Sequence, residues 1–281
     1  EVNTMQKTAL NLAALISAAL LTACGGSSDE AAANALVPTQ ADTNVLVPAP
    51  VPPDAAETAA FNADKQKRER IYQVGNTPFT PYSISVNGHT IYSQTGSRSN
   101  PIGVIDFRSL PPGFATYNGT YTEDSGSATV KVRSYQGFRS GILLTYNDGN
   151  EFVNVSSYGV DTPSVGIPAA GKATYTGTAF DHNERGSLTY NVNFAAKTGQ
   201  GRIDGLNKYG SITLAEGEFT QNRQSNGGTT NGIVGKASAA AGDRFDYGVI
   251  FFGNHAEEIT GYAVNEYKGI GLHGTRGAIT E

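Results

Sequence analysis

The sequence predicts an all-β protein, in which a β-rich, sandwich-like first half is followed by an eight-stranded antiparallel barrel over residues 171–281. In this second half, apolar and polar residues alternate in eight short runs, and Gly, Asn or Asp bound each run. The alternation is unbroken over residues 187–194, which place Leu, Tyr, Val and Phe on one face. No helical periodicity competes with it. Eight evenly spaced strands suit a small barrel that side chains can fill, so we expect a solid scaffold rather than a pocket.

The preceding residues, 58–170, are also expected to form a β-rich domain. Asn87-Gly88 predicts a tight hairpin, because both residues tolerate the positive φ of a type I′ turn. The pattern leaves a small sandwich and a single sheet open, and the helix-compatible composition of residues 55–72 favours one short helix at the domain entrance. The candidate strands are Tyr82–Val86, His89–Ser93, Gly103–Phe107, Thr116–Thr122, Ala128–Tyr135, Gly141–Tyr146 and Phe152–Ser157.

Composition excludes several classes of protein. The chain has 281 residues and a net charge of −5, and its one dense basic stretch is residues 65–70. This balance argues against a nucleic-acid partner, whose phosphates need a basic surface. A single cysteine excludes an intramolecular disulfide and any multi-cysteine zinc site.

The amino-terminal segment has the pattern of a lipoprotein signal peptide. Lys7 supplies the positive charge, and residues 9–21 form an apolar stretch too short to span a bilayer. Leu21-Thr22-Ala23-Cys24 resembles a bacterial lipobox. The resemblance implies removal of residues 1–23 and attachment of acyl chains, such as palmitate, to Cys24. Gly25 after the cysteine implies the outer membrane. The alternative is a structural cysteine.

Residues 24–57 are expected to form a disordered linker. They are rich in Pro and Ala, with five prolines between residues 38 and 53, and they offer few large apolar residues for a core. We interpret the segment as a stalk that holds the folded part away from the membrane. A ligand for a proline-binding domain is the alternative.

The sequence contains no set of residues with the pattern of a catalytic site or a metal centre. The four histidines show no zinc spacing, and no HExxH motif occurs. Ser140 lies between glycines but not in a GxSxG nucleophile elbow. Glu257-Glu258, next to His255, fits a turn before the last hairpin better than acid–base machinery. We therefore do not expect an enzyme.

His89 is the one candidate for cofactor binding. It follows the hairpin turn and has the aromatic neighbours Tyr82 and Tyr92. A neutral imidazole is a good axial ligand for haem, and aromatic side chains suit a flat macrocycle. An exposed histidine on a strand is the alternative, and Tyr135, Tyr158 or a surface without a ligand remain equally open.

Several motifs in the second half resemble one family. Tyr175-Thr176-Gly177, the G-x-G-x-I-x-G-L run at residues 199–206 and the FGNHAEEITG run at residues 252–261 are similar to the C-terminal barrel of transferrin-binding protein B. Factor H binding protein and the hemophilins share this barrel. The resemblance implies export by a Slam-type outer-membrane translocator (the type XI secretion system), for which the barrel would be the signal.

A second resemblance concerns the first half. The run VRSYQGFRSGILL, at residues 132–144, is similar to the effector domain of hemophilins, which carries haem. The implied partners are a host haem protein, another host surface molecule or a TonB-dependent receptor. Hemophilins are secreted, whereas this chain carries a lipobox. A colonisation factor that binds no small-molecule cofactor is therefore the alternative function, and a binder of an immune regulator rests on analogy with the barrel alone.

Overall fold

The computed structural model describes residues 69–73, 81–97, 100–106, 110–159, 162–223 and 229–281. Within these ranges the chain forms sixteen β-strands and one short 3₁₀ helix, η3 (Ser164–Gly166). The prediction of an all-β protein is confirmed. Over the same ranges, no helix has the length and apolar character needed to cross a membrane.

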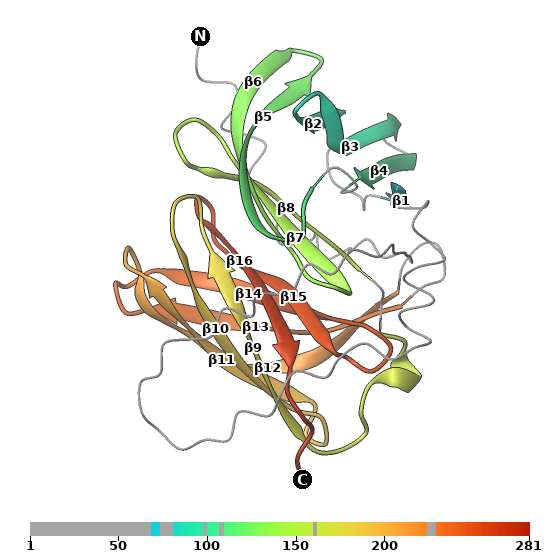
Figure 1. Cartoon of the computed structure of the whole chain (residues 1–281), viewed down its shortest axis with the longest axis vertical. Helices are drawn as coiled ribbons and strands as arrows, with labels where there is room; N and C mark the ends of the chain where they lie inside the picture. Colours follow the sequence, from blue (N-terminus) through green and yellow to red (C-terminus); the bar gives the residue numbers. More distant parts are fainter. Residues whose placement is uncertain (1–68, 74–80, 98–99, 107–109, 160–161, 224–228) are drawn as a thin grey trace.

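The first eight strands form one antiparallel sheet, which is curled (Figure 1). The sheet has the order β1-β4-β3-β2-β5-β6-β7-β8, so a single sheet replaces the sandwich that the sequence had left open. Its strands are β1 (Glu69–Gln73), β2 (Tyr82–Val86), β3 (His89–Ser97), β4 (Asn100–Asp106), β5 (Gly113–Glu123), β6 (Gly126–Gln136), β7 (Ser140–Tyr146) and β8 (Phe152–Gly159).

Two local features of this sheet test predictions made from the sequence, namely a tight turn at Asn87-Gly88 and a short helix within residues 55–72. Asn87 and Gly88 have φ values of 50° and 79°, so the predicted tight turn joins β2 to β3. Residues 69–72, in contrast, are not helical, because β1 pairs with β4 from Glu69 to Gln73. Backbone groups at the edge of β4 offer hydrogen bonds that override a weak helical composition. The rest of the expected helix lies outside the described residues.

The last eight strands close into an antiparallel barrel, in which β9 pairs with both β10 and β16. All eight runs of alternating residues in the second half are strands. They are β9 (Lys172–Phe180), β10 (Arg185–Asn193), β11 (Thr198–Leu206), β12 (Gly210–Arg223), β13 (Thr229–Ala239), β14 (Arg244–Phe252), β15 (Glu258–Val264) and β16 (Gly269–Arg276).

Side chains fill the interior of the barrel. On β10, Leu188, Tyr190 and Val192 are buried in the core cluster, whereas the residues between them are exposed. The hydroxyls of Tyr190 and Tyr247 lie 3.2 Å apart, and Tyr247 donates to the carbonyl of Ala215 at 2.7 Å. The polar tips of the large rings are therefore satisfied inside the core. The expected solid scaffold is what the structure shows.

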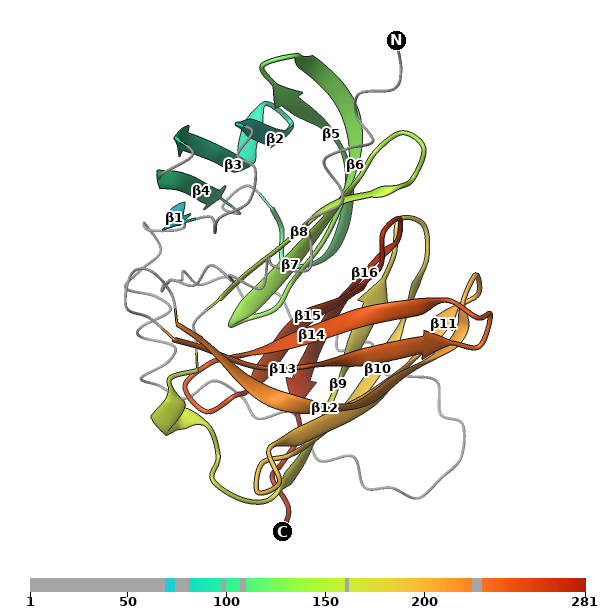
Figure 2. The same ribbon diagram turned by 180° about the vertical axis from the view of Figure 1, so that it is seen from behind.

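The curled sheet packs against one side of the barrel (Figure 2). Strands β7 and β8 contact β15 and β16, and Phe180 of β9 joins the same apolar cluster. The other members of that cluster are Phe114, Tyr135, Ile142, Leu144, Tyr146, Phe152, Val155 and Val264. One face of the first sheet is thus committed to the barrel, and the opposite face is turned away from it.

Truncating one interior side chain of the barrel should show how far the fold depends on this core. Leu188→Ala is expected to lower the free energy of unfolding by about 2–5 kcal/mol, because it removes buried apolar contact and leaves a cavity. Urea unfolding followed by circular dichroism measures it. Thr189→Ala changes the exposed neighbour on the same strand and is expected to cost less than about 0.5 kcal/mol. Equal losses in the two variants would contradict a filled interior.

Candidate functional site

The pairing register divides the first sheet into two faces. Residues paired across neighbouring strands share a face, and successive residues of one strand alternate. On β6, Arg133 and Tyr135 belong to the face that meets the barrel, which we call the anchoring face. We call the opposite one the distal face. Among the described residues, its side chains are those of Tyr82, Ile84, Val86, His89, Tyr92, Gln94, Ala115, Tyr117, Tyr121, Glu123, Ala128, Val130, Val132, Ser134, Gln136, Leu143, Thr145, Asn154, Ser156 and Tyr158.

Glu258, the first residue of β15, holds the turn between β6 and β7 on the barrel. Its carboxylate accepts hydrogen bonds from the backbone amides of Phe138 and Arg139, each at 3.1 Å, and from the hydroxyl of Ser140 at 2.7 Å. His273 on β16 lies 3.2 Å from the same carboxylate. Only 2% of Glu258 is exposed, so these donors replace the water that the charge has lost.

The environment of Glu258 favours its ionised form. Burial by itself raises the pKa of the carboxyl group, but the hydrogen bonds from His273, Ser140 and Arg139 and the charge interaction with His273 outweigh it. The net result is a lowered pKa. The anchor is therefore a buried carboxylate that is stable only while its donors stay in place.

The grouping of Ser140, His273 and Glu258 does not have the geometry of a nucleophilic triad. In such a triad the imidazole uses one nitrogen for the serine and the other for the carboxylate. Here Nε2 of His273 faces both groups, at 3.3 Å from Ser140 and 3.2 Å from Glu258, and the serine hydroxyl bonds to the carboxylate. All three side chains are buried at the junction. Their arrangement positions the turn.

Gly137 allows this close approach. A Cβ atom at Gly137 would lie 2.3 Å from Nε2 of His273 and 2.6 Å from Oε2 of Glu258. Any other residue would push the turn away from the carboxylate. The glycine before Phe138 is therefore explained by packing against the barrel.

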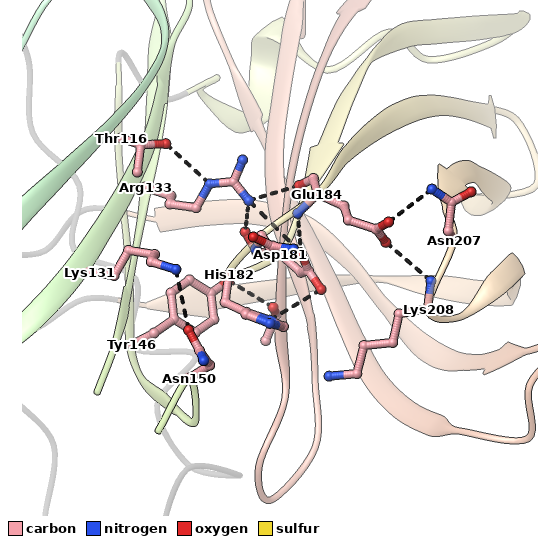
Figure 3. A network of polar contacts seen from close by, with 12 residues as sticks. Thr116, Lys131, Arg133, Tyr146, Asn150, Asp181, His182, Glu184, Asn207 and Lys208 are labelled. Carbon is pink, nitrogen blue, oxygen red and sulfur yellow. Dashed lines mark hydrogen bonds and ion pairs between the residues drawn. The ribbon is translucent and has the colours of Figure 1, made fainter. Parts of the chain in front are cut away.

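A second polar contact joins β6 to the loop between β9 and β10 (Figure 3). Arg133 donates from Nη1 to the carbonyls of Asp181 and Glu184, the latter at 2.9 Å, and from Nε to Thr116 at 3.3 Å. Its guanidinium carbon lies 4.7 Å from the ring centroid of Phe114. A charged group that is buried in this way needs several acceptors and an aromatic face.

The loop that receives Arg133 is itself ordered by Asp181. One carboxylate oxygen accepts from the amides of Asn183 at 2.8 Å and Glu184 at 2.7 Å, and the other lies 3.3 Å from Nδ1 of His182. Burial lowers the pKa of His182, Asp181 opposes this effect, and the nearby cations Lys208, Lys131 and Arg133 add to it. Glu258 and Arg133 are thus two buried charged groups that each join the first sheet to the barrel.

The distal face carries a cluster of tyrosines. The ring of Tyr82 on β2 stacks on Tyr92 of β3 and on Tyr121 of β5, with centroids 5.2 Å apart in each pair. Tyr158 of β8 donates to the side chain of Gln136 at 2.5 Å. These rings pack on a buried apolar cluster of Ile84, Val86, Ile91, Tyr92, Leu110, Val130, Val132 and Leu143. The members of this cluster are at most 4% exposed, so they form a core of the first sheet that is separate from its contact with the barrel.

The structure places the predicted site residues as follows. His89 pairs with Val86 and so belongs to the distal face, where it is exposed at the start of β3 together with its neighbours from Asn87 to Thr90. Cys24 lies outside the described residues. Of the two tyrosines that are alternatives to His89, Tyr135 belongs to the anchoring face, with its ring 4.4 Å from that of His273, and Tyr158 belongs to the distal face.

Sequence reasoning missed the part that Glu258 plays. The sequence pattern predicts that Glu257 and Glu258 together are part of a polar turn. That prediction holds for Glu257, which accepts a hydrogen bond from the amide of His255 at 2.8 Å. The partners of Glu258 in the β6–β7 turn are 118 to 120 residues away in the sequence. The available signals were an acidic residue at the start of an apolar strand, which is an unusual place for a charge, and its position in the FGNHAEEITG run at residues 252–261. Neither signal says which distant residues the carboxylate contacts.

Removing the charge at Glu258 should weaken the fold and alter its response to acid. Glu258→Gln is expected to lower the free energy of unfolding at pH 7 by on the order of 2 kcal/mol, because charge-assisted hydrogen bonds are lost. The folded-state pKa lies below the ordinary value of 4.5. The carboxylate therefore adds stability that is complete above about pH 4.5 and is lost as the pH falls through the folded-state pKa.

Urea unfolding between pH 7 and pH 3 measures this contribution. Stability of the native protein should fall more steeply below pH 4.5 than that of Glu258→Gln. Glu216→Gln, a change at an exposed position of β12, is the matched control and should follow the native curve. If the free energies of unfolding of the native protein and of Glu258→Gln fall equally steeply below pH 4.5, the role of Glu258 as an anchor is contradicted.

Comparison with known proteins finds similarity to proteins of the bacterial surface. Solved structures of transferrin-binding protein B from Haemophilus parasuis Hp5 and from serogroup B Neisseria meningitidis each share 12% identity with the chain, with TM-scores of 0.41 and 0.39. They match 75% and 66% of this chain but only 45% and 49% of their own. A structure described as a surface lipoprotein shares 14% identity over 71% of this chain and all of its own, with a TM-score of 0.34. Residues 165–263, which include β9 to β14 and most of β15, match the family model described as factor H binding protein, C-terminal.

Proposed function

We propose that this chain is a lipoprotein exposed on the surface of the outer membrane, anchored through Cys24, which binds a host molecule through its first domain. The observation that carries the proposal is the closed barrel. Its interior is filled by side chains, and one of its sides is covered by the anchoring face. Recognition is then left to the distal face and the loops of the first sheet, while the barrel serves as scaffold.

The route to the surface is the second part of the proposal. The lipobox at residues 21–24 supports a lipid anchor, and the family model that matches residues 165–263 is named for a binding protein. A Slam-type translocator that recognises the barrel would carry the chain outward. Such a role fits a domain whose core is complete without a ligand.

Haem, free or within a host haem protein, is the ligand that we propose first. His89 offers an exposed imidazole on the same face as the stacked rings of Tyr82, Tyr92 and Tyr121. A neutral imidazole coordinates haem iron, and aromatic rings stack on a porphyrin. Delivery to a TonB-dependent receptor would complete nutrient acquisition.

One observation favours a second function, that of a colonisation factor which contacts a host surface without a cofactor. His89 lies at an exposed turn, with Asn87, Gly88 and Thr90 exposed beside it. Haem sites usually shelter the iron within a pocket. An exposed hairpin instead suits contact with another protein.

Titration of the mature protein with hemin separates the two functions. Haem binding predicts a shifted Soret band at one equivalent of hemin, and His89→Ala should abolish the shift because the axial ligand is lost. His255→Ala is the control, because His255 is also exposed but lies in the barrel between β14 and β15. Absence of a Soret shift at stoichiometric hemin, or an equal loss in both variants, would reject haem coordination by His89 and leave the colonisation factor.

A further inference from the structure

Arg185, the first residue of β10, is an exposed cation without an acidic partner in the described part of the chain. Its side chain lies over the ring of Phe114 on β5, whose centroid is 5.2 Å from the guanidinium carbon. An arginine that stacks on an aromatic ring keeps the N–H groups at its edge free to donate. Arg185 therefore presents a set of donors at a fixed place on the surface.

A second arginine lies against the same ring. The guanidinium carbon of Arg133 is 4.7 Å from the centroid of Phe114. Burial lowers the pKa of Arg133, and the positive charge of Arg185 adds to this effect, so the two cations are close enough to repel each other. Nη1 and Nε of Arg133 have acceptors, whereas Nη2 has none among the described residues and points away from those acceptors in Figure 3. One ring thus carries two cations that both have donors to spare.

The acidic residues beside this pair already have partners. The carboxylate of Asp181 lies 3.9 Å from Nη1 of Arg133 and is held by two backbone amides of its own loop. The carboxylate of Glu184 accepts two hydrogen bonds from the turn between β11 and β12, at 2.9 Å and 3.1 Å. The charge of Arg185 is therefore not balanced within the described residues, although the chain as a whole carries a net charge of −5.

The surroundings of the two arginines are exposed, neutral and polar. Thr116 and Asn118 belong to the anchoring face of β5, and Ser187 and Thr189 belong to the outer face of β10. All four residues are exposed, so a ligand reaches them from solvent and needs no cavity. The hairpin of β5 and β6 extends away from the barrel (Figure 1). A ligand at this place therefore meets hydroxyl and amide groups from both halves of the chain.

We infer that Arg185 binds the carboxylate of an acidic sugar. A planar fork of N–H donors matches the two oxygens of a carboxylate, and the hydroxyl and amide side chains around it pair with the hydroxyl groups of a sugar. An acidic peptide fits less well. Peptides are usually held by a sheet edge, an apolar groove or a cluster of arginines, whereas here one exposed arginine is surrounded by small neutral side chains. The inference goes beyond the proposed function, since it adds a contact where the sheet meets the barrel and does not depend on His89.

The test titrates the full mature protein with two acidic sugars by calorimetry at low salt. The probes are 3′-sialyllactose, which carries a sialic acid, and a hyaluronan tetrasaccharide, which carries glucuronate. Lactose is the neutral comparator. Arg185→Gln is expected to lower the affinity for the acidic sugar about tenfold or more, because hydrogen bonds to a charged group are lost. Its melting temperature should stay close to that of the native protein, because the residue is exposed.

Arg244→Gln is the matched control, since Arg244 is also an exposed arginine at the first position of a barrel strand, β14, and its loss changes the net charge equally. This variant should bind the sugar as the native protein does. The inference is overturned if neither acidic sugar binds, if lactose binds equally well, or if the two variants lose the same affinity.

Two further measurements separate this inference from its neighbours. Binding of a polyglutamate peptide that depends on Arg185, without binding of either sugar, would assign the site to acidic peptides and reject the sugar. Titration of Arg185→Gln with hemin should match that of the native protein, because His89 lies on the distal face. Failure of one proposal therefore leaves the other to be judged by its own titration.

Discussion

The buried carboxylate of Glu258 is the constraint on which the relation between the two halves depends. A charge that has lost its water needs donors, and the turn between β6 and β7 supplies them through the amides of Phe138 and Arg139 and the hydroxyl of Ser140. Because these donors have fixed directions, they set the position of the turn on the barrel. An apolar contact of the same area would leave the sheet freer to slide.

The filled barrel and the two different faces of the first sheet are consistent with this arrangement. The barrel completes its own core, so it offers a rigid surface and not a cavity. The sheet has one face that packs on that surface and another that carries a buried apolar cluster of its own. Stacked tyrosine rings gather on the second face. The polar contacts with the barrel and these rings lie on opposite sides of the sheet, since alternation separates the side chains along each strand.

Local patterns in the sequence were sufficient for most of the strands. Alternation with a period of two marked all eight strands of the barrel, and Asn87-Gly88 marked a turn, because both signals depend only on neighbouring residues. The pairing of β1 with β4 was not visible, since a strand at the edge of a sheet is stabilised by a partner some 30 residues away. The anchor at Glu258 was missed for the same reason, because the turn that it holds lies about 120 residues away in the sequence.

Native-state hydrogen exchange of the β6–β7 turn tests the central claim most directly, namely that Glu258 fixes the sheet to the barrel. The amides of Phe138 and Arg139 donate to a buried carboxylate, so they should open only when the contact with the barrel opens. Their exchange is predicted to be slowed to within about tenfold of a barrel amide such as that of Val249. Exchange as fast as that of an exposed turn, such as Asp148-Gly149, would contradict the account.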